Sequence, residues 1–229
     1  MEHKQVQALA KETMKRIRTE VRAGMPLREV RERCENHMRE LGADSFWYYG
    51  VGAFVFSGNQ TALSISGRNY QTPERVLEEN DILTIDLSPQ CAGVWGDYAR
   101  TIILQNGTSV NEIAQIRNVQ WKNGLLAEER LHKELFRVAR PELTFDQLYE
   151  HMNAFIRACG WINLDFNGNL GHSIVAQKDD RIYIEKGNRR RLGDVTLFTF
   201  EPHIGAEDSP YGYKQEDIYG FENGILKQL

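Results

Sequence analysis

Two segments of the chain match each other at helical spacing, and this internal repeat constrains the fold more than any other sequence feature. Residues 27–43 (LREVRERCENHMRELGA) align without a gap on residues 145–161 (FDQLYEHMNAFIRACGW). About sixty residues beyond the start of each segment, a strand-like stretch ends in an acidic residue, Asp86 in the first half and Glu201 in the second. No proline- or serine-rich linker separates the halves. The sequence therefore predicts one domain, residues 1–229, in which two related halves face a shared cleft.

Hydrophobic spacing predicts both helices and strands. Apolar residues recur at the helical period in four segments, residues 6–17, 26–41, most of 109–136, and 144–159. Strand-like segments rich in β-branched or aromatic residues are residues 81–87, 98–104, 194–202 and 220–229. A turn, QCAGVWGD, is predicted between the first two strands. The pattern indicates an α+β fold.

Composition and charge exclude several classes of protein. The net charge of -4 gives no electrostatic reason to expect nucleic acid or an anionic membrane as a partner. No apolar stretch approaches the roughly 20 residues that cross a bilayer, and the charged N-terminal segment lacks the apolar stretch of a signal peptide. The three cysteines are isolated and form neither a disulfide framework nor a zinc-type pair. We expect a cytoplasmic protein without nucleic-acid or membrane partners.

The segment IDLSPQCAGVWGDYARTI places two aspartates, Asp86 and Asp97, on adjacent predicted strands. A hairpin pairs residues across strands, so both carboxylates can project from one face. Two close carboxylates repel each other unless a cation or a proton lies between them, and hard divalent cations prefer such oxygen ligands. Taken alone, two aspartates at this spacing are more often solvated turn residues.

Three further residues are candidates for the same site. His172 follows a glycine in LGHSIV, Glu201 lies in the apolar strand FTFEPHI, and Glu216 precedes Asp217 in YGYKQEDIYGF. A carboxylate in an apolar strand is expensive to bury unless a cation, a hydrogen-bond network or a raised pKa compensates. The ordinary alternatives are a surface or core histidine and an exposed acidic pair.

The order Asp, Asp, His, Glu, Glu resembles the M24-type metallopeptidases, which include methionine aminopeptidase, aminopeptidase P and prolidase. The resemblance covers nearly the whole chain and rests on an ordered set of motifs: Asp86 and Asp97 with Arg100-Thr101, Gly171-His172, Thr199-Phe200-Glu201-Pro202, Glu216-Asp217, and Glu222-Asn223-Gly224. It implies the pita-bread fold, in which two pseudo-symmetric halves contribute an antiparallel sheet covered by helices.

The resemblance also implies roles for these residues. Asp86 would chelate one metal ion, Asp97 and Glu216 would bridge two ions, and His172 and Glu201 would complete the second. Four carboxylates and one imidazole make a hard ligand set, which favours two divalent ions of manganese or iron, with cobalt or zinc as substitutes. Glu201 would also take the proton of the attacking water.

The substrate-handling residues depart from the family pattern. Ile65 and Asp179 stand where the peptidases carry histidines, and Lys214 replaces an arginine often found two residues before the last glutamate. His203 replaces the glycine expected after Glu-Pro. If the strand continues beyond Glu201, His203 returns to the same face and is a second catalytic candidate. The alternative is an ordinary surface histidine.

These features favour a dinuclear metal-dependent hydrolase, similar to an aminopeptidase or dipeptidase, acting on a peptide or small amide. A homodimer is a possible assembly. The resemblance implies a catalytic-type domain over residues 1–229, whereas aminopeptidase P and prolidase normally add an N-terminal domain. One alternative is a non-peptidase metalloenzyme on the same fold, either a lyase or another amide hydrolase. The other is a binding protein that retains the fold without activity.

Overall fold

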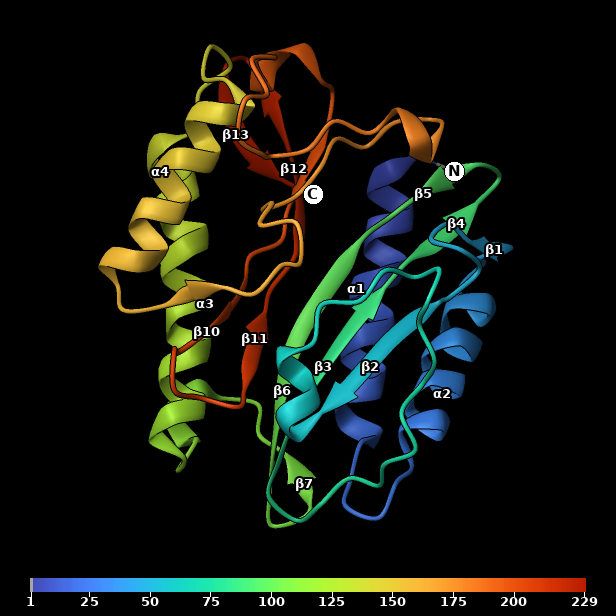
Figure 1. Cartoon of the computed structure of the whole chain (residues 1–229). Helices are drawn as coiled ribbons and strands as arrows, with labels where there is room; N and C mark the ends of the chain where they lie inside the picture. The colour runs from blue at the N-terminus through green and yellow to red at the C-terminus, as the bar shows by residue number, and fades with distance from the viewer. Residues whose placement is uncertain (1) are drawn as a thin grey trace.

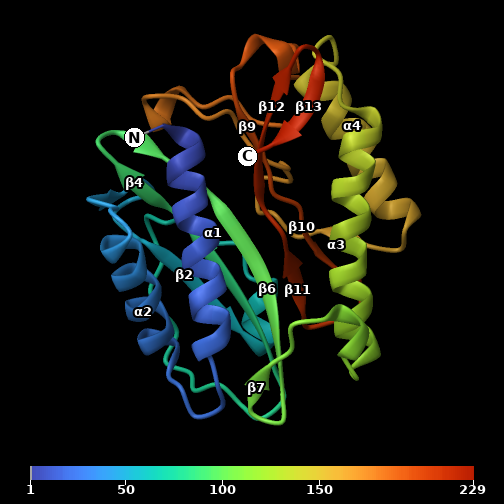
Figure 2. The same cartoon turned by 180° about the vertical axis from the view of Figure 1, so that it is seen from behind.

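The first half of the chain is an antiparallel sheet covered on one face by two helices. Figure 1 shows the computed structural model, which describes residues 2–229. The helices are α1 (His3–Glu20) and α2 (Leu27–Glu40). The sheet has the order β2 (Ala53–Ser57), β3 (Asp81–Leu87), β6 (Tyr98–Gln105) and β7 (Thr108–Ser109). Seen from behind, α1 and α2 lie across this sheet (Figure 2). Their apolar faces bury Ile17, Leu27 and Val30 in one core with Leu83 and Ile85.

The second half has a similar layout with shorter strands. Its helices, α3 (Val119–Val138) and α4 (Phe145–Ala158), lie on the outer side of two three-stranded sheets (Figures 1 and 2). One sheet has the order β11 (Gly212–Lys214), β10 (His203–Gly205) and β8 (Ile162–Asn163). The other has the order β13 (Ile225–Gln228), β12 (Asp217–Glu222) and β9 (Phe198–Phe200). Phe145, Phe198 and Tyr219 are buried in its core.

The predicted repeat is present in the structure. Helices α2 and α4 each have 14 residues and begin at the first residue of their aligned segments. Both are followed by a glycine with positive φ, Gly42 at 109° and Gly160 at 80°, a conformation that avoids strain only without a side chain. Asp86 lies near the end of β3, and Glu201 directly follows β9. The predicted α+β class and the antiparallel pairing are confirmed.

Some predicted boundaries differ from the structure. The helix expected within 109–136 begins only at Val119, because the Asn118 side chain accepts hydrogen bonds from the backbone amides of Gln120 and Trp121 and caps it there. The predicted turn at 90–97 contains a small hairpin of β4 (Pro89–Cys91) and β5 (Val94–Trp95), which pairs with β1 (Ser45–Phe46). The strand expected over 194–202 is confined to β9.

The two halves are joined where β6 meets the segment before β12. The Glu216 amide donates to the Ala99 carbonyl at 3.0 Å. The Arg100 guanidinium donates to the Glu216 carbonyl at 2.7 Å through Nη1, and its Nη2 atom donates to both carboxylate oxygens of buried Asp217, at 2.8 and 2.9 Å. Hydrogen bonds between charged groups of this kind are stronger than those between neutral groups. The Arg-Thr and Glu-Asp motifs therefore hold the Glu216 backbone against the first half. Among residues 2–229, no helix combines the length and apolarity that crossing a membrane requires.

Candidate metal centre

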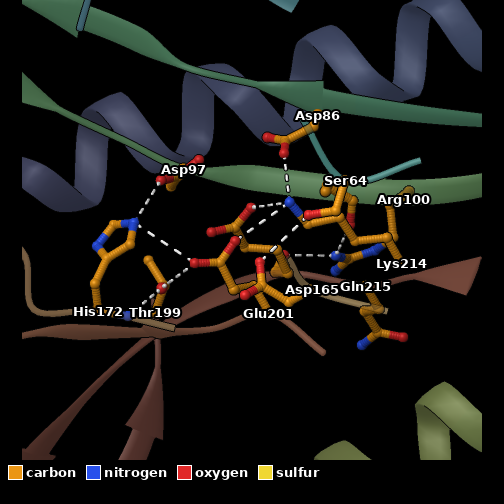
Figure 3. A network of polar contacts seen from close by, with 12 residues as sticks. Ser64, Asp86, Asp97, Arg100, Asp165, His172, Thr199, Glu201, Lys214 and Gln215 are labelled. Atoms are coloured by element: carbon orange, nitrogen blue, oxygen red, sulfur yellow. Dashed lines mark hydrogen bonds and ion pairs between the residues drawn. The ribbon is translucent and has the colours of Figure 1, made fainter. Parts of the chain in front are cut away.

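The five predicted ligand residues come together between the two halves. Asp86 comes from β3 and Asp97 from the residue before β6, while the second half contributes His172, Glu201 and Glu216. Asp86 pairs with Ala99, and the β3–β6 pairing ends at Tyr98. Asp97 therefore lies one residue beyond the paired strands and reaches the cleft from the end of the β4–β5 hairpin. Figure 3 shows Asp86, Asp97, His172 and Glu201 pointing toward one another. These four residues line one cavity.

The tightest cluster of ligand atoms is at the His172 end of the cavity. One ligand atom each from Asp97, His172 and Glu216 lies within 4.8 Å of the others. The His172 Nε2 atom is 3.6 Å from Asp97 Oδ2 and 3.6 Å from Glu201 Oε1. Its Nδ1 faces the Ser173 carbonyl at 3.1 Å, which assigns the proton to Nδ1 and leaves the Nε2 lone pair directed at the cluster. Burial lowers the pKa of His172 to about 4, so the ring is neutral and suited to bind a metal.

Glu216 is a buried carboxylate that no hydrogen bond compensates in the described chain. Its side chain is fully buried, and neither carboxylate oxygen has a hydrogen-bond partner among residues 2–229. Burial raises the pKa of Glu216 well above its usual value, and nearby Asp97 and Glu201 raise it further. Burial and Asp86 likewise raise the pKa of Asp97. A divalent cation would remove this repulsion and supply the missing partner, so the residues present fit a metal ion.

Lys214 enters the cluster from the opposite end. Its Nζ atom lies 2.5 Å from Asp86 Oδ2, 3.2 Å from Glu201 Oε2 and 3.8 Å from Glu216 Oε2. Figure 3 shows the ammonium group among the carboxylates. Burial opposes the charged form, but the surrounding carboxylates, with Asp86 foremost, raise the pKa of Lys214 well above its usual value. The sequence marked Lys214 only as a departure from the family arginine and did not predict this position.

Two contacts behind the cluster set its geometry. Thr199 Oγ1 accepts the His172 amide at 3.0 Å and donates to Glu201 Oε1 at 3.3 Å. Gly171 has φ 138°, and a Cβ there would come within 2.2 Å of the Thr199 carbonyl oxygen. On the other side, the buried Gln7 amide of α1 donates to the Asp97 carbonyl at 2.7 Å and accepts the Asp97 amide at 3.1 Å. The Gly-His and Thr-x-Glu motifs are therefore in direct contact and joined by hydrogen bonds. On the other side, Gln7 of α1 holds the backbone of Asp97.

A sequence model of metallopeptidase family M24 matches residues 2–223. The chain belongs to metallopeptidase family M24. This confirms the resemblance read from the motifs. No curated protein matches the chain.

Superposition on solved structures identifies the fold of the M24 chain. X-Pro aminopeptidase from Thermotoga maritima MSB8 superposes with a TM-score of 0.80 at 21% identity, over 99% of this chain and 59% of that one. The prolidase from Pyrococcus horikoshii OT3 gives 0.78 at 19%, over 99% and 60%, and dipeptidase PepE from Mycobacterium ulcerans gives 0.78 at 18%, over 98% and 55%. The pita-bread fold is confirmed. The chain spans less than two thirds of the length of each of these structures.

His203 of the M24 chain does not lie on the same strand as Glu201. Pro202 separates β9 from β10, and the two strands belong to different sheets, so the continuous strand assumed for His203 is not formed. The ring is buried and its Nε2 donates to the Thr61 carbonyl at 2.7 Å. It lines a small cavity that also includes Asp86 and Lys214. His203 is therefore neither a surface residue nor directed at the His172 end.

The wall of the M24 cleft carries charged residues that sequence patterns did not single out. Arg181 lines the cavity and lies over the rings of Trp47 at 4.8 Å, Tyr48 at 5.4 Å and Tyr183 at 5.5 Å. Asp165 lines the same cavity and accepts backbone amides from its own loop. Both residues lie in loops, where the sequence has no helical or strand-like hydrophobic periodicity. Sequence patterns therefore did not mark them. Of the two positions where family histidines are missing, Ile65 lines this cavity.

Proposed function

We propose that this M24 chain is a metal-dependent peptidase that cleaves a small peptide, or a related amide, in the cleft between its halves. The observation that carries the proposal is the convergence of Asp97, His172 and Glu216 within 4.8 Å, with both Glu216 oxygens lacking a hydrogen-bond partner in the described chain. Within a metallopeptidase family, such a set of ligands has a direct chemical use. The aminopeptidase- or dipeptidase-like specificity belongs to the same proposal.

The proposed centre takes two divalent ions when fully loaded. The ligands would be Asp86, Asp97, His172, Glu201 and Glu216, and their hard oxygen-rich character favours manganese or iron, with cobalt or zinc as substitutes. Bound ions would supply a nucleophile at neutral pH and polarise the scissile carbonyl.

Glu201 is the proposed proton acceptor. Burial alone would raise its pKa, but Lys214 and His172 lower the pKa of Glu201, so it is anionic at neutral pH. Thr199 holds one of its oxygens, which orients the carboxylate toward the cavity. His203 is retained as a second catalytic candidate because it borders the adjoining cavity at Asp86 and Lys214.

Arg181 is the proposed anchor for a carboxylate of the substrate. Guanidinium groups suit carboxylate recognition, and three aromatic neighbours hold that of Arg181 at the cavity wall. Arg181→Met is expected to raise KM for a dipeptide with a free carboxylate by about 10- to 100-fold with a small change in kcat, because a charge-assisted hydrogen bond is lost. The KM of Arg181→Lys should lie between those of wild type and Arg181→Met. Steady-state kinetics on a dipeptide and its C-terminal amide measure this. An equal loss on both substrates would rule out carboxylate recognition.

Removal of metal is expected to destabilise the fold. Ions that bind only the folded state add about 2.7 kcal/mol to the free energy of unfolding at 100 times Kd. For a chain of this size, that corresponds to a rise in Tm of roughly 5–10 °C. Differential scanning calorimetry of chelated and Mn²⁺-loaded protein tests the effect, with Mg²⁺ as a weakly binding control. Identical Tm values after confirmed metal loss and reloading would argue against a preformed centre.

A second candidate function is a non-peptidase reaction on the same fold, either a lyase or another amide hydrolase. The observation that favours it is Ile65, which lines the cleft where the peptidases carry a histidine and cannot donate a hydrogen bond. A binding protein without activity is less favoured, because converging buried carboxylates serve no structural purpose that an apolar core would not serve better.

Turnover measurements separate these candidates. Metal-free protein, reconstituted with Mn²⁺ or Fe²⁺, is to be assayed on a panel of dipeptides, Xaa-Pro peptides and methionyl peptides. The proposal predicts hydrolysis that disappears on chelation and returns with metal. If the protein binds metal stoichiometrically but hydrolyses no peptide in the panel, the result would favour the non-peptidase reaction.

A further inference from the structure

The position of the Glu216 carboxylate depends on the backbone that carries it. Its two oxygens have no hydrogen-bond partner among residues 2–229, so no side-chain contact fixes the carboxylate before a metal ion binds. Residues 214–217 lead from the end of β11 into β12 and lie against β6 of the first half. The contacts that hold this segment therefore determine where the Glu216 carboxylate lies.

The segment is held from both halves of the molecule. The carbonyls of Lys214 and Glu216 accept hydrogen bonds from side chains of β6, at 3.1 and 2.7 Å. The carbonyl between them, that of Gln215, accepts instead from His132 Nε2 at 3.2 Å. His132 belongs to α3, which lies beside β11 in the second half (Figure 2). His132 therefore supplies a contact from the side opposite β6, one residue before Glu216.

The His132 ring is held in one orientation and one tautomer. It is buried, and its Nδ1 atom lies 2.5 Å from the Tyr219 hydroxyl oxygen. Because a carbonyl can only accept, the ring proton is on Nε2, and Nδ1 accepts from Tyr219. Burial lowers the pKa of His132 to about 4, so the ring is neutral at neutral pH and keeps this pattern. Phe200, the residue before Glu201, packs against the ring with centroids 5.1 Å apart.

We infer that His132 is a positioning residue for the metal centre. Through the Gln215 carbonyl it holds the Glu216 carboxylate where a bound ion needs it. This role rests on the proposed metal centre and adds to it a residue that acts only through the backbone. Loss of a contact behind a metal ligand typically weakens metal binding by about 10- to 100-fold, and an effect of this size is expected here.

The first half has a comparable arrangement. Gln7 of α1 donates to the Asp97 carbonyl at 2.7 Å and accepts the Asp97 amide at 3.1 Å. Asp97 and Glu216 are the two carboxylates proposed to bridge the ions. The first helix of each half therefore holds the backbone at or beside one bridging carboxylate, Gln7 in the first half and His132 in the second.

Calorimetric titration of metal-free protein with Mn²⁺ tests this role. His132→Leu removes the donor to the Gln215 carbonyl and should raise the Mn²⁺ Kd by about 10- to 100-fold. His132→Gln restores a neutral N–H donor and should have a Kd within about threefold of that of wild type. His151→Leu is the matched control, because His151 is an exposed histidine of the same half that contacts Glu134 away from the centre. Its Kd should stay within about twofold of that of wild type.

Two further measurements separate positioning from a purely structural role. The electron paramagnetic resonance spectrum of bound Mn²⁺ responds to the arrangement of its ligands. It should change in His132→Leu and return to the wild-type form in His132→Gln. The Tm of the metal-free variants reports packing alone. Tyr219→Phe provides a milder change, because it keeps the His132 ring and removes only the hydroxyl that orients it, so its Mn²⁺ Kd should rise by at least about threefold.

An unchanged Mn²⁺ Kd and spectrum in folded His132→Leu, with or without a lower metal-free Tm, would overturn the inference. If His132→Leu does not fold, an unchanged Kd in Tyr219→Phe would overturn it, and a raised Kd would support it. Failure of wild type to bind Mn²⁺ would overturn it together with the metal centre. Binding that weakens in His132→Leu and recovers in His132→Gln supports the inference even without peptide hydrolysis, in which case only the proposed peptidase function fails.

Discussion

Replacing Glu201 by glutamine is expected to reduce turnover of whatever amide the protein hydrolyses by at least about 10³-fold, because the change removes both a charged metal ligand and the proposed proton acceptor. Glutamine preserves shape and retains an oxygen for the Thr199 hydroxyl, which donates to Glu201 at 3.3 Å, so folding should survive. The measurement is kcat at saturating Mn²⁺, with metal content determined on the same sample.

Glu207→Gln is the matched control for this variant, since Glu207 is an exposed glutamate of the same half. It should leave kcat within about twofold of wild type, as expected for a surface substitution. If Glu201→Gln retains most of the activity while binding metal normally, Glu201 is not the base and the assignment must move to another group in the cleft.

The second large effect is expected on metal content. Glu216→Ala or Asp97→Ala should lose bound metal, because each removes one of the three groups that converge within 4.8 Å. Loss of a ligand of this kind weakens a site well beyond the 10- to 100-fold typical of changes to outer contacts. Plasma mass spectrometry of desalted protein, after loading with Mn²⁺, measures the number of ions per chain.

Glu222→Gln serves as the control for metal loss, since Glu222 is exposed at the end of β12. Truncating Glu216 also removes a buried carboxylate without hydrogen-bond partners, so Glu216→Ala should unfold at a temperature no lower than that of metal-free wild type. Full metal content in either Glu216→Ala or Asp97→Ala would show that the ligand assignment is wrong.

The positions of the ligand residues were predictable because they depend on strand ends. Asp86 and Glu201 follow apolar strand segments at equivalent points of the internal repeat, and the structure brings both to the cleft. The α2 and α4 boundaries were predictable for the same reason, since the repeat and the flanking glycines mark them.

Other features depend on contacts between distant parts of the chain. Gln7 lies on α1, and nothing in its helix indicates that its amide holds the Asp97 backbone. The orientation of His203 depends on the break at Pro202 and on the Thr61 carbonyl, which belongs to the other half. Arg181 is placed by aromatic residues from elsewhere in the sequence. Local sequence patterns do not indicate which residues far apart in the chain will be in contact.

Lys214 shows the same limit at the centre of the site. It lies two residues before Glu216, and alternation along an extended chain allows both side chains to face the cleft. Sequence spacing does not reveal that its ammonium reaches Asp86 across the junction of the two halves. The charge balance of the centre became apparent only from the structure.

The most direct test of the metal centre is a crystal structure of Mn²⁺-soaked protein with anomalous difference density at the manganese edge. The account predicts the strongest peak within about 2.5 Å of His172 Nε2 and of carboxylate oxygens from Asp97 and Glu216. A second peak near Asp86 is expected when the proposed two-ion centre is fully loaded. Absence of any anomalous peak in this cleft at saturating Mn²⁺ would contradict the account.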